Sequence, residues 1–249
     1  MQIIALINQK GGVGKTTCVI NIGAGLNKLN KRVLLIELDP QHFLTYSLGI
    51  PARELKNTVY ELLRGTVTLN ETIVKRNGLS LVSSSLNLSG AEMEFSGMAG
   101  REFLLKELLE RLKKYDYVFI DCPPSLGLLT LNALTTAQNV YIPLQTEFLA
   151  LQSMTKLLDT ITIVKKRLNS NIDITGIIVT MFDCRKNFNR EVVEKIKEYF
   201  GNKLFNTLIR DNISFAEAPS FGKTIFEYKS KSYGAKDYLN LCREIIKRD

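Results

Sequence analysis

A single glycine-rich turn near the amino end limits what this chain can fold into. An apolar run at residues 3–7 stops at a polar turn, and a helical pattern follows. Residues 10–17 read Lys-Gly-Gly-Val-Gly-Lys-Thr-Thr. A strand, a glycine-rich turn and a helix in this order are typical of a phosphate-binding loop. The usual template has its first glycine at position 9, where this chain has Gln9, so the match is to the variant with an additional lysine, Lys10.

The turn has the chemistry of an anion site. Its successive backbone N–H groups can converge on a phosphate, and the following helix adds the positive end of its dipole. We expect Lys15 to reach the β- and γ-phosphates of a nucleotide and the Thr16 hydroxyl to ligate Mg²⁺. The alternatives are an accidental lysine after a structural turn and, for Lys10, a solvated loop side chain. The nucleotide-binding residues predicted from the turn are Gly11, Gly12, Val13, Gly14, Lys15, Thr16 and Thr17.

The composition is that of an ordinary globular protein. The chain has 249 residues, of which 45% are apolar and 23% charged, and this length suffices for one α/β domain or two small ones. Because the sequence shows no strong domain boundary, residues 1–249 are predicted to form one domain. No apolar run approaches the roughly 18–20 residues of a membrane span, and no secretory signal is recognisable. The four cysteines lie far apart, which favours reduced thiols in the cytosol. A net charge of +8 permits, but does not require, a polyanion partner.

Apolar runs alternate with amphipathic segments along the chain. This alternation predicts a doubly wound, mainly parallel sheet flanked by helices. Strands are expected at residues 32–38, 79–82, 115–121, 139–144, 173–181 and 204–209. Helices are expected at residues 17–29, 58–63, 88–94, 101–114, 126–137, 150–168, 187–200 and 235–248, and a loop at residues 216–223.

Carboxylates end several of the predicted strands, and ligands of such sheets bind at the carboxyl ends of strands. Asp121 ends an apolar strand and is expected to hold Mg²⁺ together with Thr16. Asp39, the other carboxylate expected at the metal, would orient or polarise the attacking water; the alternative is a turn residue before Pro40. The predicted catalytic residues from this pattern are Lys15 and Asp39.

Two further residues near Asp39 are open to more than one interpretation. Glu37 shares a strand face with Asp39, so it could face the metal site or pair with a lysine, and a direct catalytic role is the less favoured reading. His42 is the single histidine of the chain, which rules out a histidine-rich metal site. It is expected to be a loop residue, since phosphoryl transfer depends mainly on positioning and charge stabilisation.

Several stretches together resemble the deviant Walker A ATPases, with the closest similarity to the ParA/Soj partition ATPases. The similarity is carried by residues 10–17, 34–41 and 117–125, continues at residues 126–134, 179–183 and 216–223, and covers nearly the whole chain. It implies that Lys10 is the signature lysine, which reaches the partner's ATP across a dimer and so joins the catalytic and nucleotide-binding residues. It also implies that Asp183 and the loop containing Arg210 and Asp211 lie near the adenine.

The resemblance further implies a cycle with ATP and Mg²⁺ as cofactors. The ATP-bound homodimer would bind DNA without sequence preference, and a ParB-type centromere-binding protein would stimulate slow hydrolysis. The protein would then be cytoplasmic and associated with the nucleoid. Two residues depart from the family pattern: Glu37 replaces the usual aspartate, and Ser214 replaces an arginine associated with DNA binding.

Positive charge is denser in residues 181–249 than in the rest of the chain, which favours a polyanion surface there. Each of these side chains could instead belong to a solvated helix face. The candidates for DNA contacts are Arg185, Lys186, Lys223, Arg243 and Lys247, with Arg248 beside them.

Two other function classes share this scaffold. A MinD-type membrane-cycling ATPase ends in an amphipathic membrane helix, but packing on the sheet explains the apolar residues of segment 235–248 better, so no stable membrane association is expected. A metabolic enzyme is the other class, either a small-molecule ligase or an electron carrier related to nitrogenase reductase. The carrier needs two cysteines per subunit for its iron–sulfur cluster, and Cys122 has no evident second cysteine.

Overall fold

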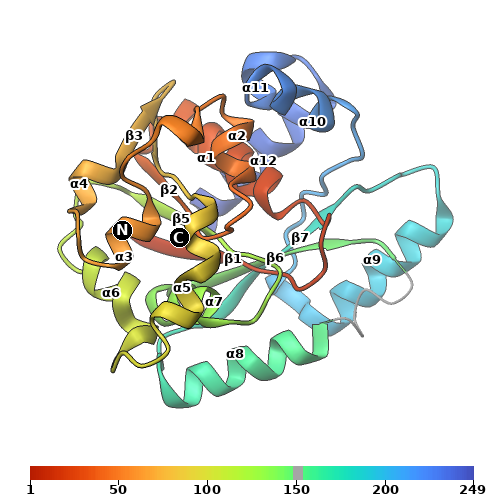
Figure 1. Cartoon of the computed structure of the whole chain (residues 1–249). Coiled ribbons are helices and arrows are strands. Elements are labelled where there is room, and N and C mark those ends of the chain that lie inside the picture. Colours follow the sequence, from red (N-terminus) through yellow and green to blue (C-terminus); the bar gives the residue numbers. More distant parts are fainter. Residues whose placement is uncertain (148–153) are drawn as a thin grey trace.

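A seven-stranded sheet with the order β3-β4-β2-β5-β1-β6-β7 runs through the middle of the computed structural model, which describes residues 1–147 and 154–249 (Figure 1). Neighbouring strands of this sheet are parallel except for the antiparallel pair β3–β4. The strands are β1 (Gln2–Leu6), β2 (Val33–Glu37), β3 (Ile73–Arg76), β4 (Leu79–Val82), β5 (Tyr117–Asp121), β6 (Asn139–Gln145) and β7 (Asp173–Thr180).

Helices cover both faces of the sheet. On one face α1 (Lys15–Lys28), α2 (Phe43–Ser47), α11 (Ile225–Tyr228) and α12 (Tyr233–Arg248) share a buried apolar cluster with the strands. A second cluster lies under α3 (Val59–Leu63), α5 (Ala91–Glu94), α6 (Leu104–Leu109), α7 (Leu128–Thr136), α8 (Thr155–Arg167) and α9 (Asn187–Phe200). The remaining short helices are α4 (Leu69–Thr72), α10 (Ser214–Glu217) and the 3₁₀ turns Ala52–Glu54, Leu86–Gly90, Arg101–Phe103, Gly201–Lys203 and Ala218–Phe221. The predicted doubly wound α/β fold is confirmed.

Most predicted elements are present, and the capping signals act as expected. The strand at residues 79–82 and the helix at residues 187–200 have the predicted bounds. The predicted helix start at Thr58 is a capping box, in which the Glu61 carboxylate accepts a hydrogen bond from the Thr58 backbone N–H (2.9 Å). The helix predicted over residues 101–114 is shorter, because α6 ends at Leu109. The first part of the predicted helix 150–168 lies outside the described residues, and the remaining part corresponds to α8.

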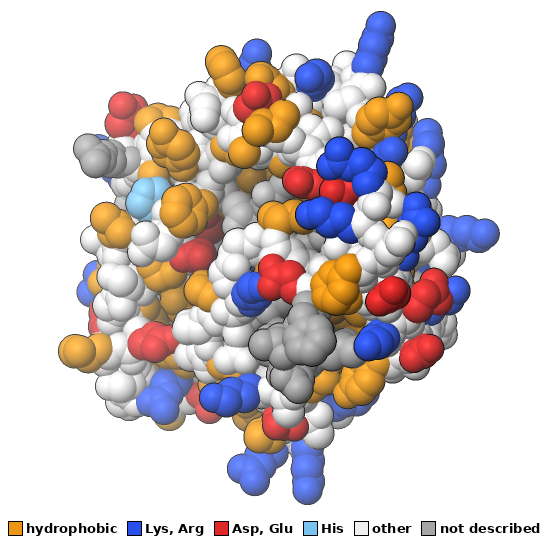
Figure 2. All heavy atoms as spheres, turned by 90° about the vertical axis from the view of Figure 1, so that its right-hand side faces the viewer, with side chains coloured by type: hydrophobic (Ala, Val, Ile, Leu, Met, Phe, Trp, Pro, Cys, Tyr) orange, Lys and Arg blue, Asp and Glu red, His pale blue; other side chains and the backbone are white. Residues whose placement is uncertain are grey.

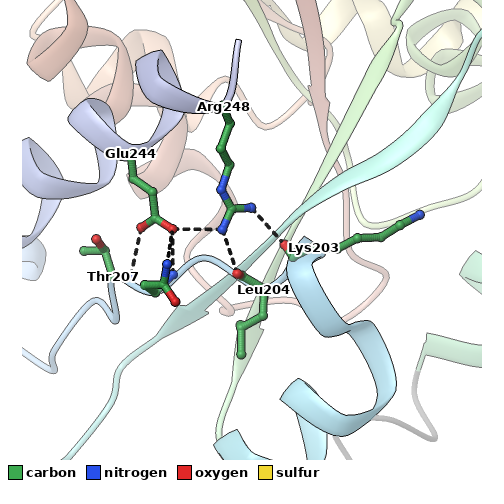
Figure 3. A network of polar contacts seen from close by, with 6 residues as sticks. Lys203, Leu204, Thr207, Glu244 and Arg248 are labelled. Atoms are coloured by element: carbon green, nitrogen blue, oxygen red, sulfur yellow. Dashed lines mark hydrogen bonds and ion pairs between the residues drawn. The ribbon is translucent and has the colours of Figure 1, made fainter.

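The strand predicted at residues 204–209 was wrong. This segment runs beside β7, but the isolated bridge Ile177–Leu204 lies at its start and the isolated bridge Phe182–Arg210 directly after its end. The backbone N–H groups of Asn206 and Thr207 are taken by the Glu244 carboxylate of α12, at 2.8 and 3.0 Å (Figure 3). Because these two N–H groups donate to a side chain of α12, they are not available for hydrogen bonds to a neighbouring strand. The segment therefore does not form a regular strand.

Arg248 belongs to the same network and is not a free surface charge. Its guanidinium donates to the Leu204 carbonyl (2.7 Å) and to Glu244 (2.8 Å), and lies 4.1 Å from the centre of the Phe205 ring (Figure 3). The polyanion surface suggested for this residue is therefore not supported, since the guanidinium holds α12 against segment 204–209.

Several short elements were not predicted, among them α4, α10 and α11, and one segment was predicted as a different structure. The loop expected at residues 216–223 was wrong, because this segment contains the end of α10 and a 3₁₀ turn. The edge strand β3 and the five-residue α2 carried no clear periodicity. The terminal helix packs on the sheet as expected, with Leu241, Cys242 and Ile245 buried. In the described part of the chain, no helix has the length and apolar character needed to cross a membrane.

Gly176 of β7 provides a test of the packing between this strand and segment 204–209. A Cβ at this position would lie 2.5 Å from both the Phe205 and the Tyr141 rings, which form a buried edge-to-face pair. Gly176→Ala should therefore lower the free energy of unfolding by about 1–3 kcal/mol in urea titrations. Gly97→Ala, where the new Cβ meets nothing within 4 Å, is the control. Equal stability of the two variants would contradict this packing.

Candidate nucleotide-binding site

The phosphate loop connects the end of β1 to the start of α1. Gly12 and Gly14 have φ values of 76° and 86°, a region that side chains disfavour, so the turn requires glycine at both positions. Gly14 is the N-cap of α1 and has no side-chain cap, so the first N–H groups of the helix remain available to an anion. The loop therefore has the geometry that the sequence predicted.

Neighbouring strands hold the loop in place through residues that the motif did not reveal. Buried Asn8 donates to the Pro143 carbonyl of β6 (2.8 Å) and accepts the Lys10 backbone N–H (2.9 Å). Thr180, at the end of β7, donates to the Val13 carbonyl (2.9 Å). The only sequence signal was position: both residues end apolar strands.

Lys15, Thr16 and Asp121 converge at the carboxyl ends of β1 and β5. The Thr16 hydroxyl donates to Asp121 Oδ2 (2.7 Å), and Lys15 is itself buried. Burial lowers the pKa of Lys15, whereas the negative charges of Asp121 and Asp39 work to raise it. These two carboxylates thus lie near enough to Lys15 to act on its charge.

Asp121 has the properties expected of a metal-binding carboxylate. Burial raises its pKa to about 7, against the hydrogen bond from Thr16 and the charge of Lys15. Its Oδ1 is buried and has no hydrogen-bond partner among the described residues, which would be costly if nothing bound there. Hydroxyl and carboxylate oxygens suit Mg²⁺, which usually takes few protein ligands and completes its shell with water and phosphate oxygens. Thr16 and Asp121 therefore fit this ion.

Asp39 lies in the turn directly after β2, beside the same site. Its Oδ1 accepts the Gln41 backbone N–H (2.9 Å), and its carbonyl accepts that of His42 (3.0 Å). The side chain is half-buried, and its charge contributes to raising the pKa of Asp121. Asp39 is thus a turn residue before Pro40, as one of the two interpretations of the sequence predicted. It also lies beside Asp121.

Glu37 serves a purpose that the strand pattern did not indicate. Its carboxylate is fully buried and accepts the backbone N–H groups of Leu44 (2.6 Å) and Thr45 (3.1 Å), so it caps α2. Burial raises its pKa to about 8, while these hydrogen bonds work to lower it. Among the residues that the structure describes, Glu37 does not pair with a lysine, which the sequence had left open. His42 is a loop residue as expected, the N-cap of α2.

Lys10 lies on the outer side of the loop. Its side chain is 41% exposed, and its ammonium pairs with Glu147, which follows β6. The Lys10 carbonyl, by contrast, faces Lys15, whose Nζ lies 3.5 Å away. The two lysines of the motif thus occupy different environments, one exposed and one buried.

The residues expected near the adenine follow β7. The Asp183 carboxylate accepts two hydrogen bonds of 2.9 Å from the Arg185 guanidinium. Lys186 Nζ lies 3.9 Å from Asp183 Oδ2. Arg210 pairs with Asp237 of α12, and the Asp211 N–H donates to the Phe182 carbonyl (3.1 Å). These loops lie beyond Thr180, on the same edge of the sheet as the phosphate loop.

The candidate DNA-binding side chains are all exposed, but they lie on different elements. Arg185 and Lys186 precede α9, Lys223 follows the 3₁₀ turn Ala218–Phe221, and Arg243 and Lys247 lie on α12. Figure 2 shows lysine and arginine side chains gathered on the side of the molecule where α9 lies, with acidic side chains between them. This face therefore has mixed charge with a positive excess.

Two observations bear on the competing function classes. Cys122 is fully buried, with its Sγ 3.8 Å from the Ile120 carbonyl, so it does not offer a surface thiol for a cluster shared between subunits. Within residues 1–147 and 154–249, no three His, Cys, Asp or Glu side chains form a group that could hold a metal ion.

The loop, the buried lysine and the Thr16–Asp121 pair define a phosphate-loop nucleotide-binding protein. A family model described as an AAA domain matches residues 1–174. The chain is 44% identical to the sporulation initiation inhibitor protein Soj of Bacillus subtilis, over 98% of both chains. It is 41% identical to the chromosome partitioning protein ParA of Caulobacter vibrioides, covering 100% of this chain and 95% of that protein.

A solved structure has the same fold. The crystal structure of cobyrinic acid a,c-diamide synthase from Mycobacterium smegmatis with bound ADP and magnesium has a TM-score of 0.88 and 36% identity, covering 99% of this chain and 94% of that one. The chain belongs to the ParA/Soj family of partition ATPases, as the resemblance of its motifs implied.

The raised pKa of Asp121 predicts how its removal changes stability with pH. Between the unfolded-state pKa of about 4 and the folded-state value of about 7, the folded protein binds more protons than the unfolded chain. This carboxyl therefore makes the metal-free protein less stable as pH rises through that range. Asp121→Asn should gain stability relative to the unsubstituted protein between pH 5 and pH 8.

Urea titrations with a chelator and without nucleotide would measure this difference. Asp159→Asn, at an exposed carboxylate of α8, is the matched control. A stability difference for Asp121→Asn that does not change with pH would show that this carboxyl does not titrate as described.

Proposed function

We propose that this chain is a Mg²⁺-dependent ATPase that partitions DNA, and that two copies close around two ATP molecules. The observation that carries the proposal is the convergence of buried Lys15 with the Thr16–Asp121 pair at the start of α1, whose N-cap residue Gly14 makes no side-chain cap hydrogen bond. When bound, Mg²⁺ would neutralise the charge of the phosphates. Thr16 and Asp121 would hold the ion, Lys15 would bind the phosphates, and Asp39 would orient the attacking water.

The position of Lys10 supports the dimer. An exposed ammonium on the outside of the loop can serve a nucleotide bound to a second copy, as an arginine finger does elsewhere. Its present partner Glu147 is 52% exposed, and an exposed ion pair contributes only about 0–1 kcal/mol. Lys10 can therefore exchange this carboxylate for the phosphates of a partner subunit.

DNA is the proposed polyanion, contacted by exposed basic side chains. Arg185 shares its guanidinium with Asp183, which weakens its field, while Lys223, Arg243 and Lys247 are exposed. Ser214, at the position of the family's second arginine, is buried at the start of α10 and cannot reach a phosphate. One phosphate contact fewer should reduce the salt dependence of binding by about one unit of slope.

The partner and location follow from the family. A ParB-type centromere-binding protein would stimulate hydrolysis and so dissociate the dimer from DNA. This function requires a cytoplasmic protein that associates with the nucleoid when it carries ATP. The cargo would be a chromosome, a plasmid or another body.

The two alternatives are a membrane-cycling ATPase and a metabolic enzyme. The burial of the apolar side of α12 disfavours the first, since that side is not available to lipid. For the second, the solved synthase is less identical in sequence than the two partition proteins, at 36% against 41% and 44%. Partition is therefore the better supported function.

Substitution of either lysine of the motif should impair the protein, but at different steps. Lys15→Ala removes the buried phosphate contact, so it should lose detectable binding of ATP. Lys10→Ala should bind ATP with an affinity within about threefold of the unsubstituted protein, yet remain monomeric, because the missing charge acts across the interface. Nucleotide titration and light scattering after gel filtration would measure both. Dimerisation of Lys10→Ala with ATP would exclude the proposed role in trans.

DNA binding should require ATP. We expect binding of unrelated duplexes with ATP and Mg²⁺, little binding with ADP, and weaker binding at 200 mM than at 50 mM salt. Sedimentation with anionic liposomes under the same conditions tests the membrane alternative, and no binding is expected. Liposome binding without DNA binding would favour the MinD-type alternative over partition.

A further inference from the structure

Glu37 ends β2 with a carboxylate that has no contact with solvent. Oε1 accepts the Leu44 N–H (2.6 Å), and Oε2 accepts the Thr45 N–H (3.1 Å), the Thr45 hydroxyl and the Ser84 N–H (3.4 Å). All four partners donate to this carboxyl group. The two strands β2 and β4 and the helix α2 are thereby joined at one buried point.

The carboxylate supplies the cap that α2 lacks. The N-cap residue of α2, His42, has a left-handed backbone (φ 46°) and makes no side-chain cap hydrogen bond. A helix of five residues is not stable alone, and its first N–H groups have no partners within the helix. The outward side chains of α2, Phe43 and Tyr46, are 58% and 66% exposed and give it little packing there. Its position therefore depends strongly on Glu37.

The same contact closes the turn that contains Asp39. The chain leaves β2 at Glu37, forms the turn at residues 39–42, and returns to Glu37 at Leu44 and Thr45. Within this closed segment Asp39 is fixed by hydrogen bonds from Gln41 and His42. Moving α2 away from Glu37 would displace one end of a turn whose other end is the buried strand.

We propose that Glu37 is a positioning residue for ATP hydrolysis, which holds Asp39 at the phosphate loop by fixing α2 to the end of β2. The proposal rests on the proposed function, in particular on the water-orienting role of Asp39. In this role the buried Glu37 acts through Asp39 and makes its own contacts with Leu44, Thr45 and Ser84. Its effect should appear in the chemical step and leave nucleotide binding largely unchanged, because the phosphate loop is held separately by Asn8 and Thr180.

The principal test is Glu37→Gln. The side-chain NH₂ group of glutamine is a donor, so it cannot accept the hydrogen bond that one of the two Glu37 oxygens accepts from the backbone N–H of Leu44 or Thr45. We expect kcat to fall at least tenfold, since a displacement of about 1 Å in an active site can cost about 100-fold. KM for ATP and the affinity for a non-hydrolysable analogue should change by less than threefold. Glu71→Gln, which alters the capping box of α4, is the control and should leave kcat unchanged. A kcat for folded Glu37→Gln within twofold of normal would overturn the proposal.

Two further variants separate positioning from loss of folding. Thr45→Val removes one donor from the same contact at nearly constant volume and should lower kcat less than Glu37→Gln. Glu37→Asp keeps both acceptor oxygens on a shorter side chain and should restore part of kcat. Activity of Glu37→Asp no higher than that of Glu37→Gln would show that the carboxylate is not what matters.

Coupling to Asp39 is the decisive measurement. In an Asp39→Ala background, Glu37→Gln should not reduce the residual single-turnover rate further, because its target is absent. An equal fall with and without Asp39 would show that Glu37 acts by another route. Failure of the proposed function gives a different result: the unsubstituted protein would not hydrolyse ATP, or Asp39→Ala would hydrolyse it normally.

Discussion

Three buried parallel strands that end at one level are the constraint on which the site depends. Leu6 of β1 lies opposite Asp121 of β5, and Asp121 lies opposite Glu37 of β2. The phosphate loop, Asp121 and the Asp39 turn therefore leave the sheet side by side. Since this register is set by ladders in the core, the relative positions of the reacting groups are fixed before any ligand binds.

The polar groups of this edge divide into satisfied and unsatisfied ones. Glu37 accepts hydrogen bonds from two elements, and Asn8 and Thr180 use theirs to hold the loop. In the part of the chain that the structure describes, Asp121 Oδ1 has no hydrogen-bond partner, and the first N–H groups of α1 have no side-chain cap. The satisfied groups hold the framework, and the unsatisfied ones mark where an anion and a cation would bind together.

The sequence could predict the site because its residues occupy positions that recur in the pattern of strand ends. A glycine turn before a helix and an aspartate after an apolar run can be recognised without tertiary information. The role of Glu37 could not be found in this way, because its donors belong to α2, a helix too short to show periodicity. The same limitation explains residues 204–209: their apolar pattern predicts a strand, but Glu244 lies 35 residues or more along the chain and takes the N–H groups that a strand would need.

The covering of β7 by segment 204–209 has a consequence for solubility. A long exposed edge strand can add strands from other molecules and start aggregation. Here the outer backbone groups of β7 are partly paired with this segment, through the N–H groups of Phe205 (3.0 Å) and Ile209 (2.9 Å). At the opposite edge β3 has only four residues, two of them Lys75 and Arg76. The sheet thus ends on both sides in a form that discourages the addition of a further strand.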